Sequence, residues 1–107
     1  MNGNGNGVIK INLEKLVKER LEEIAERGKV GNQAEQILIS TATLIYQVLS
    51  TRSDQIDREI KDRIEEKRKE VGLFFPLITE AIFDWREEGR EDIPKKIKEL
   101  AKEINDE

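Results

Sequence analysis

The sequence predicts a mostly α-helical protein with a single β-strand near its N-terminus. Three observations support this fold class: an alternating segment at residues 8–13, helical repeats of apolar residues through most of the remaining chain, and glycines or prolines where those repeats stop. No second strand pattern is evident. We therefore expect helices to build the core and the strand to pair with something outside its own chain.

The segment 8–13 has the two-residue period of a strand with one buried face. One face carries Ile9, Ile11 and Leu13, and the other carries Val8, Lys10 and Asn12. The simplest partner for a lone strand is the same strand of a second copy, which predicts a homodimer. The preceding residues 1–7 alternate Asn and Gly and predict a flexible arm.

Two helices are predicted after the strand, at about 14–27 and 33–50. Gly28 and Gly31 bracket the turn between them, and Asn32 followed by Glu35 predicts a capping box at the start of the second helix. The second helix is apolar on more than one side, so it should be the most buried element. With the inward face of the strand, it supplies the predicted dimer core: Ile9, Ile11, Leu13, Ile37, Leu38 and Leu44.

Three further helices are predicted at about 54–71, 76–88 and 93–105. The first has only a thin apolar line, which is typical of a helix that lies on a surface or against a partner. Gly72 is predicted to end it, and Pro76 and Pro94 fall in the first turns of the next two helices, where a missing N–H costs nothing.

Composition excludes several kinds of site. The 107 residues include no cysteine and no histidine, which removes disulfides, thiolate zinc sites and the commonest general base. We find no nucleophile–base pair and no phosphate-binding loop, so we expect neither enzyme activity nor a cofactor. No apolar run approaches the ~20 residues of a membrane span, and we expect a soluble, cytoplasmic protein. Charged residues form 39% of the chain, as in many proteins of hot organisms.

Net charge gives little support for a nucleic-acid partner. The formal charge is −4, and residues 1–50 hold six basic and six acidic side chains. The N-terminal half is therefore neutral, without a broad basic surface for phosphates.

Residues 9–25 nevertheless resemble the ribbon-helix-helix family of DNA-binding proteins. An alternating strand ends at Leu13, and apolar residues follow four, eight, eleven and twelve positions later, at Val17, Leu21, Ile24 and Ala25. The glycine-containing turn and the polar N-cap also resemble the family. The resemblance covers residues 8–50, less than half of the chain.

The resemblance implies a homodimeric transcriptional regulator, such as a plasmid, viral or archaeal repressor, whose paired strands enter the major groove of double-stranded DNA. The outward strand residues Val8, Lys10 and Asn12 would contact bases. Lys29, Asn32 and Gln33 would contact phosphates at the start of the second helix. The chain would then divide into an arm (1–7), a dimerisation and DNA-binding module (8–50) and a helical extension (51–107).

Two alternatives remain open at this point. One is an all-helical structural or protein-interaction protein, such as a coiled-coil assembly subunit, without a nucleic-acid role. The other is an antitoxin that binds DNA through its N-terminal module and a toxin through residues 51–107. Under either alternative the protein partner is a second copy of the chain or a different protein bound by residues 51–107. We expect no membrane partner.

Overall fold

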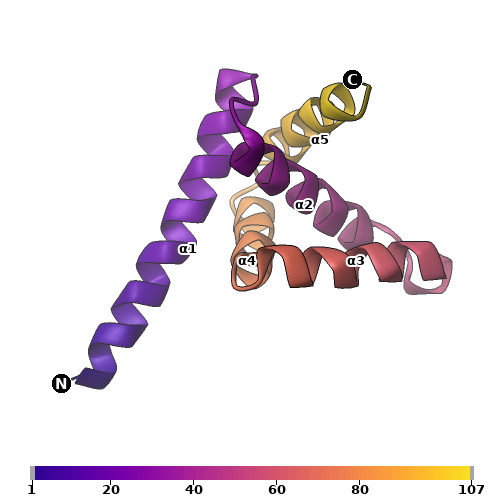
Figure 1. Ribbon diagram of the computed structural model, residues 1–107. Coiled ribbons are helices and arrows are strands. Elements are labelled where there is room, and N and C mark those ends of the chain that lie inside the picture. Colours follow the sequence, from indigo (N-terminus) through magenta and orange to yellow (C-terminus); the bar gives the residue numbers. More distant parts are fainter. Residues whose placement is uncertain (1, 107) are drawn as a thin grey trace.

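The computed structural model describes the backbone of residues 2–106 and the side chains of residues 13–52 and 54–104. Within residues 2–106 the chain forms five α-helices and one short 3₁₀ helix, and it contains no β-strand (Figure 1). The elements are α1 (Asn2–Arg27), α2 (Gln33–Ser50), η1 (Ser53–Gln55), α3 (Arg58–Val71), α4 (Phe74–Glu87) and α5 (Asp92–Asp106). The prediction of a mostly helical protein is confirmed.

The assignment to the ribbon-helix-helix family is wrong, because that fold needs a β-strand and residues 8–13 lie inside α1. In a helix each backbone N–H bonds the carbonyl four residues earlier, so it is not offered to a strand of a second copy. The alternation spans only six residues, and it leads directly into a segment rich in the helix formers Leu, Lys and Glu. The longer helical repeat decides the local structure. α1 begins at Asn2 and so includes most of the Asn-Gly segment.

The remaining boundaries follow local sequence signals closely. α2 has the predicted bounds, and α1 ends before Gly28, whose φ of 72° suits a residue without a side chain. α3 also ends at its predicted glycine, Gly72. Its start differs from the prediction: the N-cap is Asp57, whose Oδ1 accepts the N–H of Ile60 at 2.9 Å. η1 occupies the preceding residues, where the sequence predicted the first turn.

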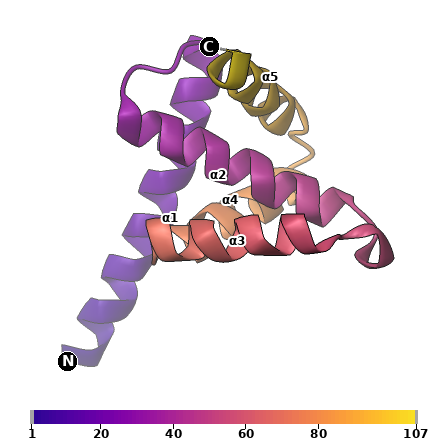
Figure 2. The ribbon, with the colours of Figure 1, turned by 45° about the vertical axis from the view of Figure 1, so that its right-hand side comes forward.

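Helices α1, α2, α4 and α5 enclose one hydrophobic core. Its fully buried large side chains come from all four helices: Leu21, Ile24, Ile39, Thr41, Ile78, Trp85, Ile93 and Ile97. The core therefore draws on residues from both sides of position 50, where the sequence suggested a boundary between module and extension. α3 contributes no buried residue and runs beside α2 at the surface (Figure 2), as its thin apolar line predicted.

Polar contacts fix the position of α1 against α4. Trp85 Nε1–H donates to Glu22 Oε2 at 2.9 Å, which satisfies the indole of a fully buried side chain. Lys18 Nζ lies 2.8 Å from Glu88 Oε1. The hydrogen bond and the charge of Glu88 raise the pKa of Lys18. These contacts leave the N-terminal half of α1 extending beyond the other helices (Figures 1 and 2).

Among the described residues, no helix is both long enough and apolar enough to cross a membrane.

Candidate interaction surface

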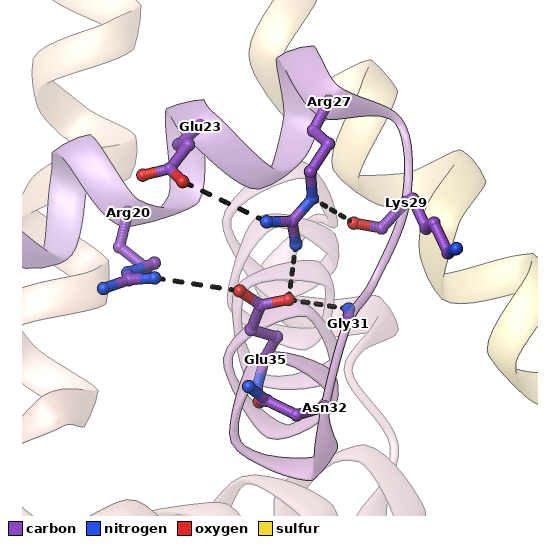
Figure 3. A network of polar contacts seen from close by, with 7 residues as sticks. All are labelled: Arg20, Glu23, Arg27, Lys29, Gly31, Asn32 and Glu35. Carbon is purple, nitrogen blue, oxygen red and sulfur yellow. Dashed lines mark hydrogen bonds and ion pairs between the residues drawn. The ribbon is translucent and has the colours of Figure 1, made fainter.

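The turn between α1 and α2 is held by a carboxylate and two arginines (Figure 3). Asn32 Oδ1 accepts the N–H of Glu35 at 2.9 Å, which confirms the predicted N-cap of α2. The carboxylate of Glu35 accepts the N–H of Gly31 at 2.6 Å and a hydrogen bond from Arg27 Nη2 at 2.5 Å. In a capping box this carboxylate would bond the N–H of the cap residue itself. Here it bonds the N–H one residue earlier.

Glu35 is only 5% exposed, and its surroundings favour the charged form. The hydrogen bond from Gly31 lowers the pKa of Glu35, burial opposes this shift, and the positive charges of Arg27 and Arg20 lower the pKa further. A Cβ at position 31 would lie 2.8 Å from Glu35 Oε1, so a larger residue there would displace this carboxylate. The positive, N-terminal end of the α2 dipole therefore lies beside the carboxylate of Glu35.

Glu35→Gln is expected to lower the free energy of unfolding at neutral pH by about 1.5–3 kcal/mol, the range for a hydrogen bond to a charged group. Because the pKa of Glu35 lies below its ordinary value of 4.5 in the fold, the ionised carboxylate stabilises the protein above that pH. This stabilisation is lost as the pH falls through the lowered pKa. Urea denaturation from neutral pH to about pH 3 should therefore show wild type and variant converging in acid.

The control for this experiment is Glu23→Gln, which removes an exposed carboxylate 4.0 Å from the same Arg27. It should change stability by less than about 0.5 kcal/mol, as is usual for an exposed ion pair. Equal pH profiles for the two variants would show that Glu35 does not hold the turn.

An apolar groove of about 290 Å³ lies between the first half of α2 and the junction of α3 with α4. It is lined by Ala34, Ile37, Leu38, Val71 and Phe74, and Glu70 is the one charged residue among its lining. At the same junction Leu73 is 78% exposed and Phe74 is 46% exposed. Large apolar side chains gathered around a groove are a feature of binding surfaces, whereas single exposed ones are ordinary.

Two leucines of α1 are exposed as well. Leu13 is 39% exposed and Leu16 is 59% exposed. Leu16 lies one helical turn before Arg20, whose Nη1 is 3.8 Å from Glu35 Oε2 at the start of α2. Leu16 therefore faces the side of α1 on which the first turns of α2 lie. We call the combined set the apolar surface: Leu13, Leu16, Ile37, Leu38, Val71, Leu73 and Phe74.

The structure distributes the residues of the predicted dimer core over three places. Leu13, Ile37 and Leu38 belong to the apolar surface. Leu44 is buried in the core of the single chain. Positions 9 and 11 lie in α1, and the side chains of Ile9 and Ile11 lie outside the described ones.

Of the residues predicted to contact DNA, three have described side chains, and these lie at the turn between α1 and α2. The side chains of Val8, Lys10 and Asn12, on α1, lie outside the described ones. Lys29 is exposed, and its backbone carbonyl accepts Arg27 Nε–H at 3.0 Å. Gln33 is exposed at the start of α2, beside the cap residue Asn32. Phosphate contact by the last three stays a prediction, and a phosphate there would face the carboxylate of Glu35.

Sequence reasoning did not single out Leu73 and Phe74 as surface residues. Phe74 is half-exposed, whereas Trp85 on the same helix is fully buried. A signal was present in the sequence, because Gly72 ends a helix inside a run of large apolar residues. A tight corner of this kind cannot turn every neighbouring side chain inward.

No group of three or more His, Cys, Asp or Glu residues within the described part of the chain is arranged to hold a metal ion. No family model, curated protein or solved structure matches this chain. We therefore infer function from the chain's own geometry.

Proposed function

We propose that this chain is a helical self-assembly module, in which the part of α1 before Val17, with the exposed Leu13 and Leu16, packs along the apolar groove of a second copy. The observation that supports this proposal is that one chain carries both halves of such a contact. The groove lies between α2 and the α3–α4 junction. α1 extends beyond the other helices (Figure 1), and its Leu13 and Leu16 are exposed. An amphipathic helix in an apolar groove is a common mode of recognition between proteins.

The low intrinsic stability of the first turns of α1 also supports a second copy as the partner that fills the groove. The backbone of these turns extends beyond the other helices (Figure 1), and the first of the described side chains of α1 to be buried is Val17. Those turns include Gly3, Gly5 and Gly7, and each glycine costs about 1 kcal/mol relative to alanine inside a helix. Isolated helical segments shorter than about 12–15 residues are marginal in water. Packing against another molecule supplies the stabilisation that these turns need.

Symmetry makes the arrangement self-consistent. In a two-fold dimer each contact occurs twice, so the α1 segment of each copy fills the groove of the other. Each large aliphatic side chain moved from water into such a contact contributes about 1.5–3 kcal/mol at full burial. The proposal keeps Leu13, Ile37 and Leu38 as interface residues, as the sequence predicted, and replaces the paired strands by helices.

The test is sedimentation velocity over a concentration series with two charge-introducing variants, Leu16→Glu and Phe74→Glu. Wild type should be dimeric at micromolar concentration. Each variant should raise the dimer Kd by about 100-fold, because a buried unpaired carboxylate costs several kcal/mol. The change should leave the helical content in circular dichroism intact, since both side chains are substantially exposed in the single chain.

Phe83→Glu is the matched control. Phe83 is also an exposed aromatic residue of α4, but it lies on the side of that helix away from the buried Ile78, Ile82 and Trp85. Its substitution should leave the dimer Kd within about tenfold of wild type. A wild-type protein that stays monomeric at the highest concentration, or a control that dissociates as readily as Leu16→Glu, would refute self-assembly through this surface.

A separate experiment tests the DNA-binding role predicted from the sequence. Wild type and Lys29→Ala are titrated against double-stranded DNA by fluorescence anisotropy at two salt concentrations. Salt-dependent binding that Lys29→Ala weakens would support a nucleic-acid role, carried by helices and not by a ribbon. Absence of binding at low salt would leave self-assembly as the function.

A further inference from the structure

The wall of the apolar groove opposite α2 is built by two helices that differ in how firmly they are held. Glu70 and Val71 come from the last turn of α3, and Phe74 comes from the first turn of α4. α4 is anchored in the core by Leu77 and Ile78, which follow that turn and are buried. α3, whose side chains are all described, has none that is buried. The part of the wall that α3 supplies is therefore only as well placed as α3 itself.

A short row of half-buried apolar side chains holds α3 along its length. Ile60, Ile64 and Val71 are spaced by four and seven residues, so they share one side of the helix. The neighbour of α3 along most of its length is α2, which runs antiparallel to it (Figure 2). The middle of α3 lines a hollow together with Leu44, and its end meets Ile37 across the apolar groove. The row therefore attaches α3 to the surface of α2.

A cation–π contact joins the last turn of α3 to α4. The guanidinium carbon of Arg68 lies 5.0 Å from the centroid of the Phe75 ring, and Phe75 packs against the core. Arg68 is exposed, and a cation–π contact at an exposed site is weak. The docked position of α3 thus depends on half-buried side chains and on this contact, and not on packing in the core.

We propose that α3 is a movable wall of the self-assembly groove, and that its docking on α2 and the binding of a second copy depend on each other. This inference rests on the self-assembly proposed above. When α3 leaves α2, Glu70 and Val71 leave the groove, and Ile37 and Leu38 lose the surface opposite them. A second copy then binds the docked form better than the undocked form, and by linkage it favours docking by the same factor. α3 thereby sets the fraction of chains that can assemble.

The test variant is the double substitution Ile60→Gln and Ile64→Gln. Neither residue lines the apolar groove, so the variant leaves the interface itself unchanged. Glutamine is a good helix former, so α3 keeps its helical tendency and loses its apolar contacts with α2. In sedimentation velocity the dimer Kd should rise about tenfold or more, because the docked fraction enters once for each of the two grooves. The fluorescence of Trp85, the only tryptophan, checks that the core stays folded.

Trypsin measures the docking of α3 directly, because six of its 14 residues are lysine or arginine. Cleavage within residues 58–69, followed by mass spectrometry at limiting protease, requires this helix to leave α2 and unwind. In wild type the rate constant for this cleavage should fall as the protein concentration rises through the dimer Kd. In the monomeric variant Leu16→Glu it should not change with concentration. The double glutamine variant should be cleaved faster than either protein.

The matched control is Glu65→Gln, which places the same residue on an exposed side of α3 and should behave as wild type does in both measurements. A double variant that is cleaved faster but dimerises as tightly as wild type would overturn this inference and leave self-assembly standing. Tighter dimerisation would overturn it too, because α3 would then cover the binding face. Cleavage at the wild-type rate would show that these contacts do not hold α3, which also contradicts the inference. A wild type that stays monomeric would refute self-assembly, and this inference with it.

Discussion

A chain that ends at position 52 is expected to lose most of its helical structure. Such a chain retains α1 and α2 and removes α4 and α5, which supply the other half of the core. Leu21, Ile24 and Ile39, all fully buried in the intact chain, would then face water. Each such side chain contributes about 1.5–3 kcal/mol through burial, and a whole domain is stable by only about 5–15 kcal/mol. Far-UV circular dichroism of the shortened chain measures the loss.

The control for this truncation is complementation. Adding residues 53–107 as a separate peptide should restore helical content in proportion to complex formation, because the missing half of the core is supplied in trans. A shortened chain that unfolds cooperatively on its own would show instead that the first two helices form an independent module, as the sequence division at position 50 suggested.

Trp85→Ala is expected to lower the free energy of unfolding of the full chain by about 3–5 kcal/mol, the usual cost of replacing a buried large aromatic residue by alanine. Trp85 is fully buried where α4 meets α1, and its indole N–H donates to Glu22. The substitution removes the largest side chain of the core and leaves a cavity among aliphatic neighbours. Chemical denaturation monitored by circular dichroism gives the difference.

Two further variants separate packing from hydrogen bonding at this site. Trp85→Phe keeps most of the ring and loses the N–H, so it should cost less, about 1–3 kcal/mol. Glu22→Gln keeps an acceptor for the indole and removes only the charge, so it should cost less than about 1 kcal/mol. A Trp85→Ala protein as stable as wild type would mean that α1 and α4 do not pack through this residue.

The sequence signals that mark the starts and ends of helices were reliable because they act locally. Asn32 caps α2 through its own side chain, and Gly28 and Gly72 follow helices at backbone angles that suit glycine. Neither effect depends on the rest of the fold. The apolar repeats were equally informative for α2, α4 and α5, since a stripe at helical spacing must be buried against something.

The N-terminal prediction failed for a reason that is also physical. Alternation of Ile9 and Ile11 over six residues is compatible with a strand, but a strand is stable only with a neighbouring strand to bond. The described chain offers none, while a helix satisfies its backbone internally. The groove beside Val71 and Phe74 could not be located from the sequence, because it forms where the junction of α3 with α4 meets the first half of α2 in space.

The surface position of α3 has a consequence for motion. A helix without a buried side chain is joined to the rest of the molecule by its two ends and by half-buried contacts along α2. Local opening of such a segment costs much less free energy than global unfolding, so α3 constitutes a low-stability cooperative unit of its own. It can swing out while the four-helix core stays intact. Amide hydrogen exchange in α3 is then expected to follow this local equilibrium and not global unfolding.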